Sequence, residues 1–227
     1  MAINVARERL GRIFGQRCFY LFVVLLTLIG VLPFVEPATA NGRIAVNVVN
    51  LFVIIATVAA VGRTALSFVI ALLLAAPALG FQWIHLSTDD PQSLARSWAF
   101  GCALYVAAIV YLLRYVFRRE VMTTDKLFGA AAAYLMIGIS WAYIYALVGY
   151  FHPDAFALYG TAAPLSIADD LYFSFTVLTS TGFGDITPLM RQARALCVVE
   201  QVMGALFLAV LIARLAGVYP PTSRDRD

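Results

Sequence analysis

Long apolar stretches alternate with short polar ones along most of the chain. Six of these stretches are long and apolar enough to cross a membrane: 18–35, 44–62, 64–84, 94–117, 128–150 and 193–218. An α-helix needs about 20 mostly apolar residues to span the hydrocarbon core of a bilayer. The pattern therefore predicts an all-α membrane protein with six transmembrane helices.

The composition agrees with this class and argues against an enzyme. Hydrophobic residues make up 62% of the chain and charged residues only 13%, whereas soluble domains carry roughly 25% charged residues. Six spans leave little of the 227 residues for a soluble catalytic domain. Cys18, Cys102 and Cys197 each lie alone in or at the edge of an apolar stretch, so we interpret them as small core residues. We expect no catalytic residues and no cofactor.

Basic residues set the expected orientation. If the spans alternate in direction, one side of the membrane receives Arg7, Arg9, Arg12, Arg17, Arg63, Arg114, Arg118, Arg119, Lys126, Arg224 and Arg226. Loops rich in Lys and Arg face the cytosol, which predicts a multi-pass protein of the cell membrane with both termini cytosolic. Seven acidic residues fall on the outer side: Glu36, Asp89, Asp90, Asp154, Asp169, Asp170 and Asp185. They either concentrate cations there or are merely tolerated.

Between the fifth and sixth spans lies a segment that cannot cross the membrane. Residues 169–178 make two to three helical turns, with acidic residues at the N-terminal end. The stretch 179–188 cannot continue this helix through Gly182, Gly184 and Pro188. Non-helical backbone at membrane depth is tolerated only where it lines water or is buried in protein. We therefore predict a re-entrant segment.

The chemistry of this segment favours a cation. Successive carbonyls can point at one axis if left- and right-handed backbone conformations alternate, which Gly182 and Gly184 permit. The hydroxyls of Ser180 and Thr181 add oxygen atoms. The short helix before them turns its partially negative C-terminal end toward the membrane centre.

At these residues the chain resembles the pore domain of the potassium channel family, whose signature is Thr-Thr-Val-Gly-Tyr/Phe-Gly-Asp on a pore loop between two spans. The resemblance covers residues 128–218. It implies a passive potassium-selective channel with one pore loop per chain, a homotetramer in the lipid bilayer, and potassium ions as the permeant species. The implied filter is Thr179, Ser180, Thr181, Gly182, Phe183, Gly184 and Asp185, with K⁺ bound at filter oxygens of Ser180, Thr181, Gly182 and Phe183.

This reading divides the chain into a cytosolic interfacial segment and a short cytosolic tail that flank two membrane domains. The divisions are 1–17 (interfacial segment), 18–119 (four-helix peripheral domain), 120–127 (linker), 128–218 (pore domain) and 219–227 (tail). Within the pore domain we predict an outer helix over 128–150, a pore helix over 168–179, a filter over 180–185 and an inner helix over 193–218.

Several residues depart from the family pattern. Ser180 and Thr181 stand where Thr and Val are usual, and Phe183 replaces the commoner Tyr. Tyr172 and Phe173 stand where many members have tryptophans, so the usual hydroxyl-to-indole bond that braces the filter is not available in that form. We expect selectivity for potassium over sodium that is retained but reduced. A non-selective cation channel of the same architecture is the alternative, and a non-conducting sensor or accessory subunit is another.

Two residues of the last span are further candidates. Gly204 is spaced from Gly182 as a gating hinge would be, and it is alternatively a small residue for close helix packing. Glu200 is costly to bury in charged form, so it is either a pH-sensitive group or a hydrogen-bonded structural acid against the pore helix.

The first four spans lack a voltage sensor. The fourth span has Arg96 at its outer end and then nothing basic until Arg114, whereas steep voltage gating needs several charges within a span. We expect weak or no voltage dependence. Asn47 and Asn50 fall on one face of the second span, and we expect each to bond a neighbouring helix.

Overall fold

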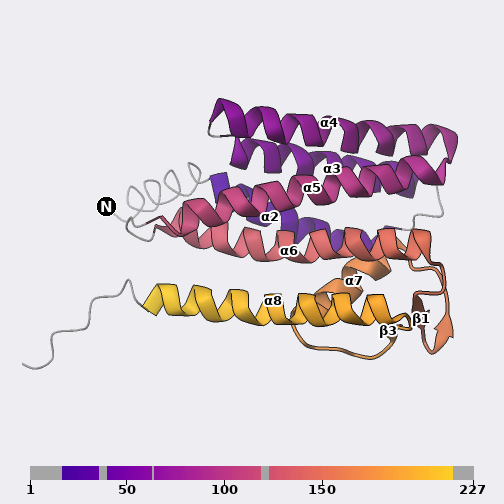
Figure 1. Ribbon diagram of the computed structural model, residues 1–227. Helices are drawn as coiled ribbons and strands as arrows, with labels where there is room; N and C mark the ends of the chain where they lie inside the picture. The colour runs from indigo at the N-terminus through magenta and orange to yellow at the C-terminus, as the bar shows by residue number, and fades with distance from the viewer. Residues whose placement is uncertain (1–16, 36–39, 63, 119–122, 217–227) are drawn as a thin grey trace, which may run out of the picture.

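Six long helices lie side by side in the computed structural model, which describes residues 17–35, 40–62, 64–118 and 123–216 (Figure 1). The predicted interfacial segment before residue 17, part of the linker and the tail lie outside the described residues. The six helices are α2 (Arg17–Val31), extended by the 3₁₀ turn η1 (Leu32–Phe34), α3 (Ala40–Val61), α4 (Ala65–Thr88), α5 (Pro91–Val116), α6 (Thr124–Phe151) and α8 (Arg191–Ala216).

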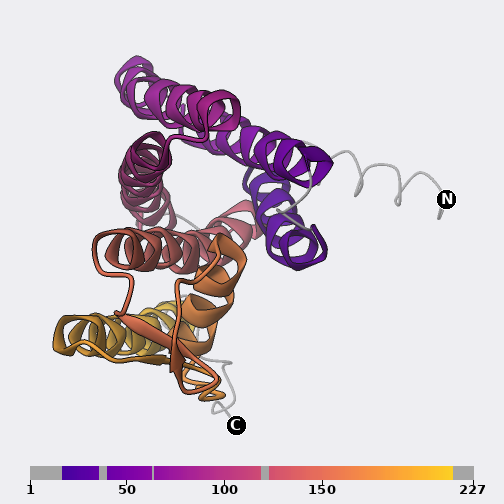
Figure 2. The same ribbon diagram turned by 90° about the vertical axis from the view of Figure 1, so that its right-hand side faces the viewer.

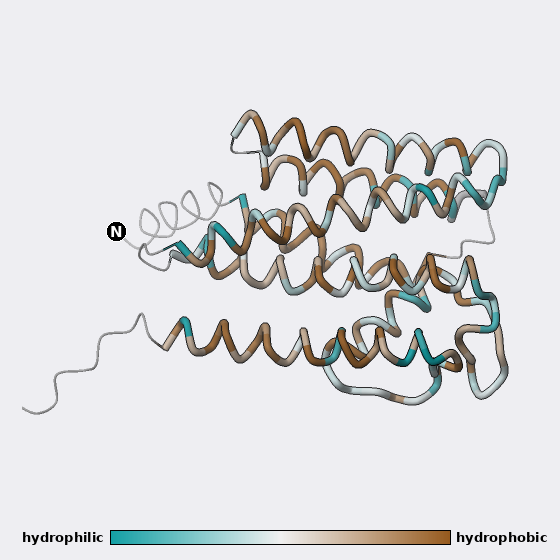
Figure 3. The backbone as a smooth tube through the Cα atoms, viewed as in Figure 1, coloured by the Kyte–Doolittle hydropathy of each residue, from teal (hydrophilic) through white to brown (hydrophobic). Residues whose placement is uncertain are grey.

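Each of the six is long and apolar enough to cross a membrane. Apolar residues run along their lengths, and hydrophilic ones gather toward the helix ends (Figure 3). A shorter helix, α7 (Ile167–Leu178), lies between α6 and α8. The predicted all-α fold, with six spans and a short helix between the fifth and sixth, is confirmed.

A small sheet, which the sequence pattern did not predict, lies beside α8. Its strands are β1 (Phe156–Leu158), β2 (Thr161–Ala162) and β3 (Ile186–Pro188), in the order β2-β1-β3 with antiparallel pairing. The register sets Ala157 opposite Thr187. Strands of two or three residues are too short for an alternating pattern to be visible in the sequence.

Local signals explain where α4 ends and α5 begins. Asp89 adopts a left-handed conformation (φ 52°) after α4, and its N–H bonds the carbonyl of His85. Asp90 then caps α5, because its side chain accepts hydrogen bonds from the N–H groups of Gln92 and Ser93. The two helices are therefore joined by only two residues and run antiparallel.

α6 lies between the peripheral helices and the pair α7 and α8. It packs against α2, α5 and α7, with the peripheral helices on one side and α7 and α8 on the other (Figures 1 and 2). Of the 28 residues of α6, 14 are buried, against three of the 26 in α8. Within a single chain, α8 is thus mostly uncovered.

Polar side chains tie α3 to α4. The Asn50 amide donates to Oε1 of Gln82 at 2.5 Å, as expected of a bond to a neighbouring helix. The prediction for Asn47 is wrong, because its amide donates to the carbonyl of Arg43 in its own helix at 2.7 Å. A helix face predicted from spacing does not determine whether an amide bonds backward along its own helix or across to another.

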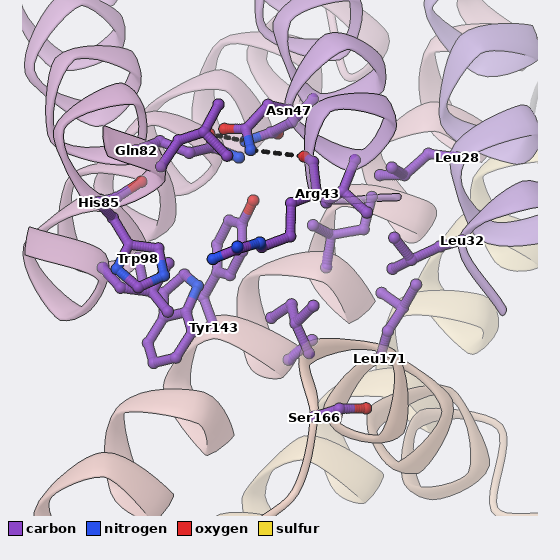
Figure 4. Close-up of a pocket in the computed structure, with 18 of the residues that line it drawn as sticks. Leu28, Leu32, Arg43, Asn47, Gln82, His85, Trp98, Tyr143, Ser166 and Leu171 are labelled. Atoms are coloured by element: carbon purple, nitrogen blue, oxygen red, sulfur yellow. Dashed lines mark hydrogen bonds between the residues drawn. The ribbon is translucent and has the colours of Figure 1, made fainter. Parts of the chain in front are cut away.

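A cavity of about 360 Å³ opens between the peripheral helices, α6 and the start of α7. Leucines and aromatic rings make up much of its wall, and the Arg43 side chain points into it (Figure 4). Leu165, Ser166, Ile167 and Leu171 contribute the part of the wall that belongs to the α7 region. The peripheral domain therefore contacts α7 directly at this end.

Candidate functional site

The short helix α7 is capped at its N-terminus and is too short to cross the membrane. Ser166 caps it, because its hydroxyl accepts from the N–H of Asp169 while the Asp169 carboxylate accepts from the N–H of Ser166. Twelve residues rise by about 18 Å at 1.5 Å per residue, which is shorter than the roughly 30 Å hydrocarbon core. The helix therefore cannot cross the membrane by itself, and the segment 179–185 begins at its C-terminal end.

The backbone of that segment alternates in handedness. Ser180, Gly182 and Gly184 have φ values of 57°, 55° and 83°. The left-handed conformation was predicted from the sequence for the two glycines but not for Ser180, because nothing in a serine side chain signals a left-handed residue. For a residue with a Cβ this conformation costs roughly 1–2 kcal/mol.

Hydrogen bonds to the last turn of α7 hold this conformation. The N–H of Ser180 donates to the carbonyl of Val177 at 2.9 Å. The N–H groups of Thr181 and Gly182 both donate to the carbonyl of Thr176, at 2.8 and 3.2 Å. The first part of the segment is therefore attached to the C-terminal end of α7.

Side-chain contacts also attach the C-terminal part of the segment 179–185 to α7. The rings of Tyr172 and Phe183 stack at 6.1 Å between centroids, with 9° between their planes. The Tyr172 hydroxyl donates to the Asp185 carboxylate, and this bond raises the pKa of Tyr172. The N–H of Tyr159 donates to the Asp185 carbonyl at 2.7 Å. A tyrosine thus contacts both Phe183 and Asp185, where the family pattern leads one to expect an indole.

The segment is uncovered within one chain. All residues from Thr179 to Gly184 are exposed, and the Phe183 side chain is 69% exposed. Exposed non-helical backbone cannot face lipid, because its polar groups would have no partners there. The segment must therefore face water or be covered by another protein surface.

Glu200 lies fully buried behind α7 and joins three helices. Its Oε2 accepts from the Tyr145 hydroxyl of α6 at 2.5 Å, and its Oε1 lies 2.6 Å from the Ser174 Oγ of α7. Ser174 Oγ also lies 2.7 Å from the carbonyl oxygen of Gly138 in α6. Of the two readings of this acid, the geometry favours a hydrogen-bonded structural group against the short helix.

Two glycines let the long helices approach α7 closely. A Cβ on Gly204 would collide with the carbonyl oxygen of Leu178, the last residue of α7, and would lie 2.9 Å from its Cδ1. A Cβ on Gly138 would lie 2.6 Å from Cζ of Phe175. Gly204 was identified from its spacing, and this contact agrees with its close-packing role. Gly138 was missed, because one glycine in an Ala-rich span carries no distinguishing signal.

The fourth transmembrane helix has the arginine positions expected from the sequence. Arg96, near the start of α5, donates to Oε1 of Gln92 at 3.4 Å and lies over the ring of Phe81 at 5.7 Å. Arg114 lies in the last turn. The sequence between them in α5 contains no basic residue.

Comparison with known proteins points to one class for this region. Residues 132–219 match a family model described as "Ion channel". The matched region begins in α6 and includes α7, the segment 179–185 and α8, while the four peripheral helices lie outside it. No curated protein matches the chain, and no solved structure does. The match and the six apolar helices support a multi-pass membrane protein of the ion-channel type.

Proposed function

We propose that the chain is one subunit of a homotetrameric, potassium-selective channel that is not steeply voltage-gated, and that residues 179–185 form its filter. The observation that carries this proposal is the left-handed conformation at alternate residues Ser180, Gly182 and Gly184. In such a backbone, successive carbonyl oxygens can face a common axis. The oxygens of Ser180, Thr181, Gly182 and Phe183 would replace the water around a potassium ion.

The need for several copies follows from exposure. In a single chain the filter residues and most of α8 are uncovered, and lipid cannot satisfy the polar groups of the filter backbone. Copies arranged around an axis would cover both surfaces and enclose water at the centre. The number four comes from the resemblance to potassium channels. The cytosolic location of both termini and residence in the cell membrane rest on the distribution of arginines.

Ion flux into liposomes tests the proposal. Purified protein is reconstituted with a potassium gradient, and flux is compared with that under an equal sodium gradient. We expect faster flux with potassium. Equal rates for both ions would indicate the non-selective alternative, and the absence of flux from an intact tetramer would indicate an accessory or sensor subunit.

The chain offers a matched pair of variants for this assay. Gly184 and Gly160 have φ values of 83° and 80°, and neither has an atom within 4 Å of an added Cβ. Alanine therefore imposes a similar backbone strain of roughly 1–2 kcal/mol at both sites. We expect Gly184→Ala to abolish selective flux and Gly160→Ala, in the turn between β1 and β2, to leave it intact. Equal effects of the two variants would contradict the assignment of the filter.

A further inference from the structure

The buried contacts of Glu200 restrict where protons can lie. Ser174 Oγ is within hydrogen-bond distance of two oxygen atoms, Oε1 of Glu200 at 2.6 Å and the carbonyl of Gly138 at 2.7 Å. A serine hydroxyl has one proton to donate and can accept two. The carbonyl of Gly138 can only accept. If Glu200 were ionised, one proton would have to serve both contacts.

A proton on Oε1 of Glu200 resolves this conflict. The acid then donates to Ser174 Oγ, Ser174 donates to the carbonyl of Gly138, and Tyr145 donates to Oε2. Every donor in this chain has one acceptor. A proton on Oε2 would not help, because Ser174 would still face two acceptors.

The surroundings of Glu200 also favour the protonated, neutral carboxylic acid. The ion pair found among the described residues joins Arg43 to Asp89 near the outer end of the peripheral domain, and no described Lys or Arg is paired with Glu200. Glu200 has no exposed surface and lies within a membrane-spanning helix. An ionised carboxylate without a cationic partner is very costly at such a site.

We propose that Glu200 is a neutral carboxylic acid that donates its proton to Ser174, and that the resulting chain of hydrogen bonds from Tyr145 to Gly138 fixes α7 between α6 and α8. Glu200 is thereby a positioning residue for the filter, a role that rests on the proposed function. Gly204, one turn further along α8, contacts the last residue of α7. Two consecutive turns of α8 thus hold the helix from which the filter begins.

The protonation state can be measured without ion flux. Infrared spectroscopy of the purified protein in lipid at neutral pH detects the C=O stretch of a protonated carboxylic acid. We expect this band in the wild type and the loss of one component of it in Glu200→Gln, while the component that comes from Asp170 remains. Asp170→Asn serves as the comparison variant, because Asp170 is the other buried acid of this region. Identical carboxyl bands in the wild type and Glu200→Gln would overturn the proposal.

Substitutions separate a neutral donor from a charged group. Glutamine has an amide that can donate to Ser174 and an oxygen that can accept from Tyr145, so Glu200→Gln should keep the potassium-to-sodium flux ratio and the melting temperature of the wild type. Glu200→Ala should lower the ratio by about tenfold, because the hydroxyls of Ser174 and Tyr145 lose their partner. If Glu200→Ala does not fold, Ser174→Ala removes the same acceptor from the acid and leaves α8 unchanged. Loss of selectivity in Glu200→Gln would refute the neutral-donor role.

The two proposals can fail separately. If the infrared band is present and the wild type conducts no ions, Glu200 is neutral but the chain is not a channel. If the wild type conducts selectively and the band is absent, the channel stands and the neutral acid does not.

Discussion

Replacing Gly204 by Ala tests how closely α8 must approach α7. The added Cβ would overlap the carbonyl oxygen of Leu178 and would lie 2.9 Å from its Cδ1. The carbonyl belongs to the backbone of α7, so a change of side-chain rotamer cannot relieve the overlap. One of the two helices must shift, and the shift would move the residue that precedes the filter.

The cost of such overpacking is about 1–3 kcal/mol. For a chain of this size, this corresponds to a melting temperature lower by roughly 2–12 °C. We expect Gly204→Ala to lower both the melting temperature in detergent and the potassium-to-sodium flux ratio in liposomes. A pure gating hinge predicts a different result, namely altered opening with unchanged stability and selectivity.

Gly149→Ala is the matched control, because no atom lies within 4 Å of a Cβ added at that position in α6. Alanine is favoured over glycine in a helix by about 1 kcal/mol, so this variant should be as stable as the wild type or slightly more stable. A Gly204→Ala protein with the melting temperature and flux ratio of the wild type would refute the packing argument. If both variants lost melting temperature and flux ratio equally, alanine would be poorly tolerated at either site, and the packing argument would be refuted as well.

Three further predictions concern the surroundings of α7. Burial raises the pKa of Asp170 to about 8; because its folded pKa exceeds the unfolded value, the free energy of unfolding should fall as pH rises from about 4 to about 8. In thermal melts across this range, the melting temperature should fall with rising pH in the wild type, and this fall should be absent in Asp170→Asn. Tyr172→Phe keeps the stacked ring but removes the hydroxyl that interacts with Asp185, and it should reduce the potassium-to-sodium flux ratio. Gly138→Ala should lower the melting temperature, because its Cβ would lie 2.6 Å from Phe175 Cζ, and Phe175→Leu in the same chain should restore part of the loss by making room.

The sequence was sufficient for features that a membrane imposes directly. Span length and apolarity follow from bilayer thickness, so the six long helices and the short α7 could be placed without a structure. The positive φ of Gly182 and Gly184 was also predictable, because glycine is the residue that most often adopts this conformation.

Features that depend on distant partners could not be found in this way. Tyr145 lies 55 residues before Glu200 in the sequence, and nothing local indicates that they meet. Two other misses have local causes. The left-handed Ser180 depends on a hydrogen bond to Val177 at the end of α7. The helix face of Asn47 was predictable, but its bond to the Arg43 carbonyl in the same helix was not.

Pairing of β3 with β1 fixes the C-terminal end of the segment 179–185, just as α7 fixes its N-terminal end. The number of residues between these two attachments therefore determines how the segment crosses the gap. An inserted residue within 179–185 would have to bulge out of line, whereas an insertion after Gly160, in the exposed turn, would not lengthen this segment. The length of the loop is thus as strict a requirement on this protein as the identity of its glycines.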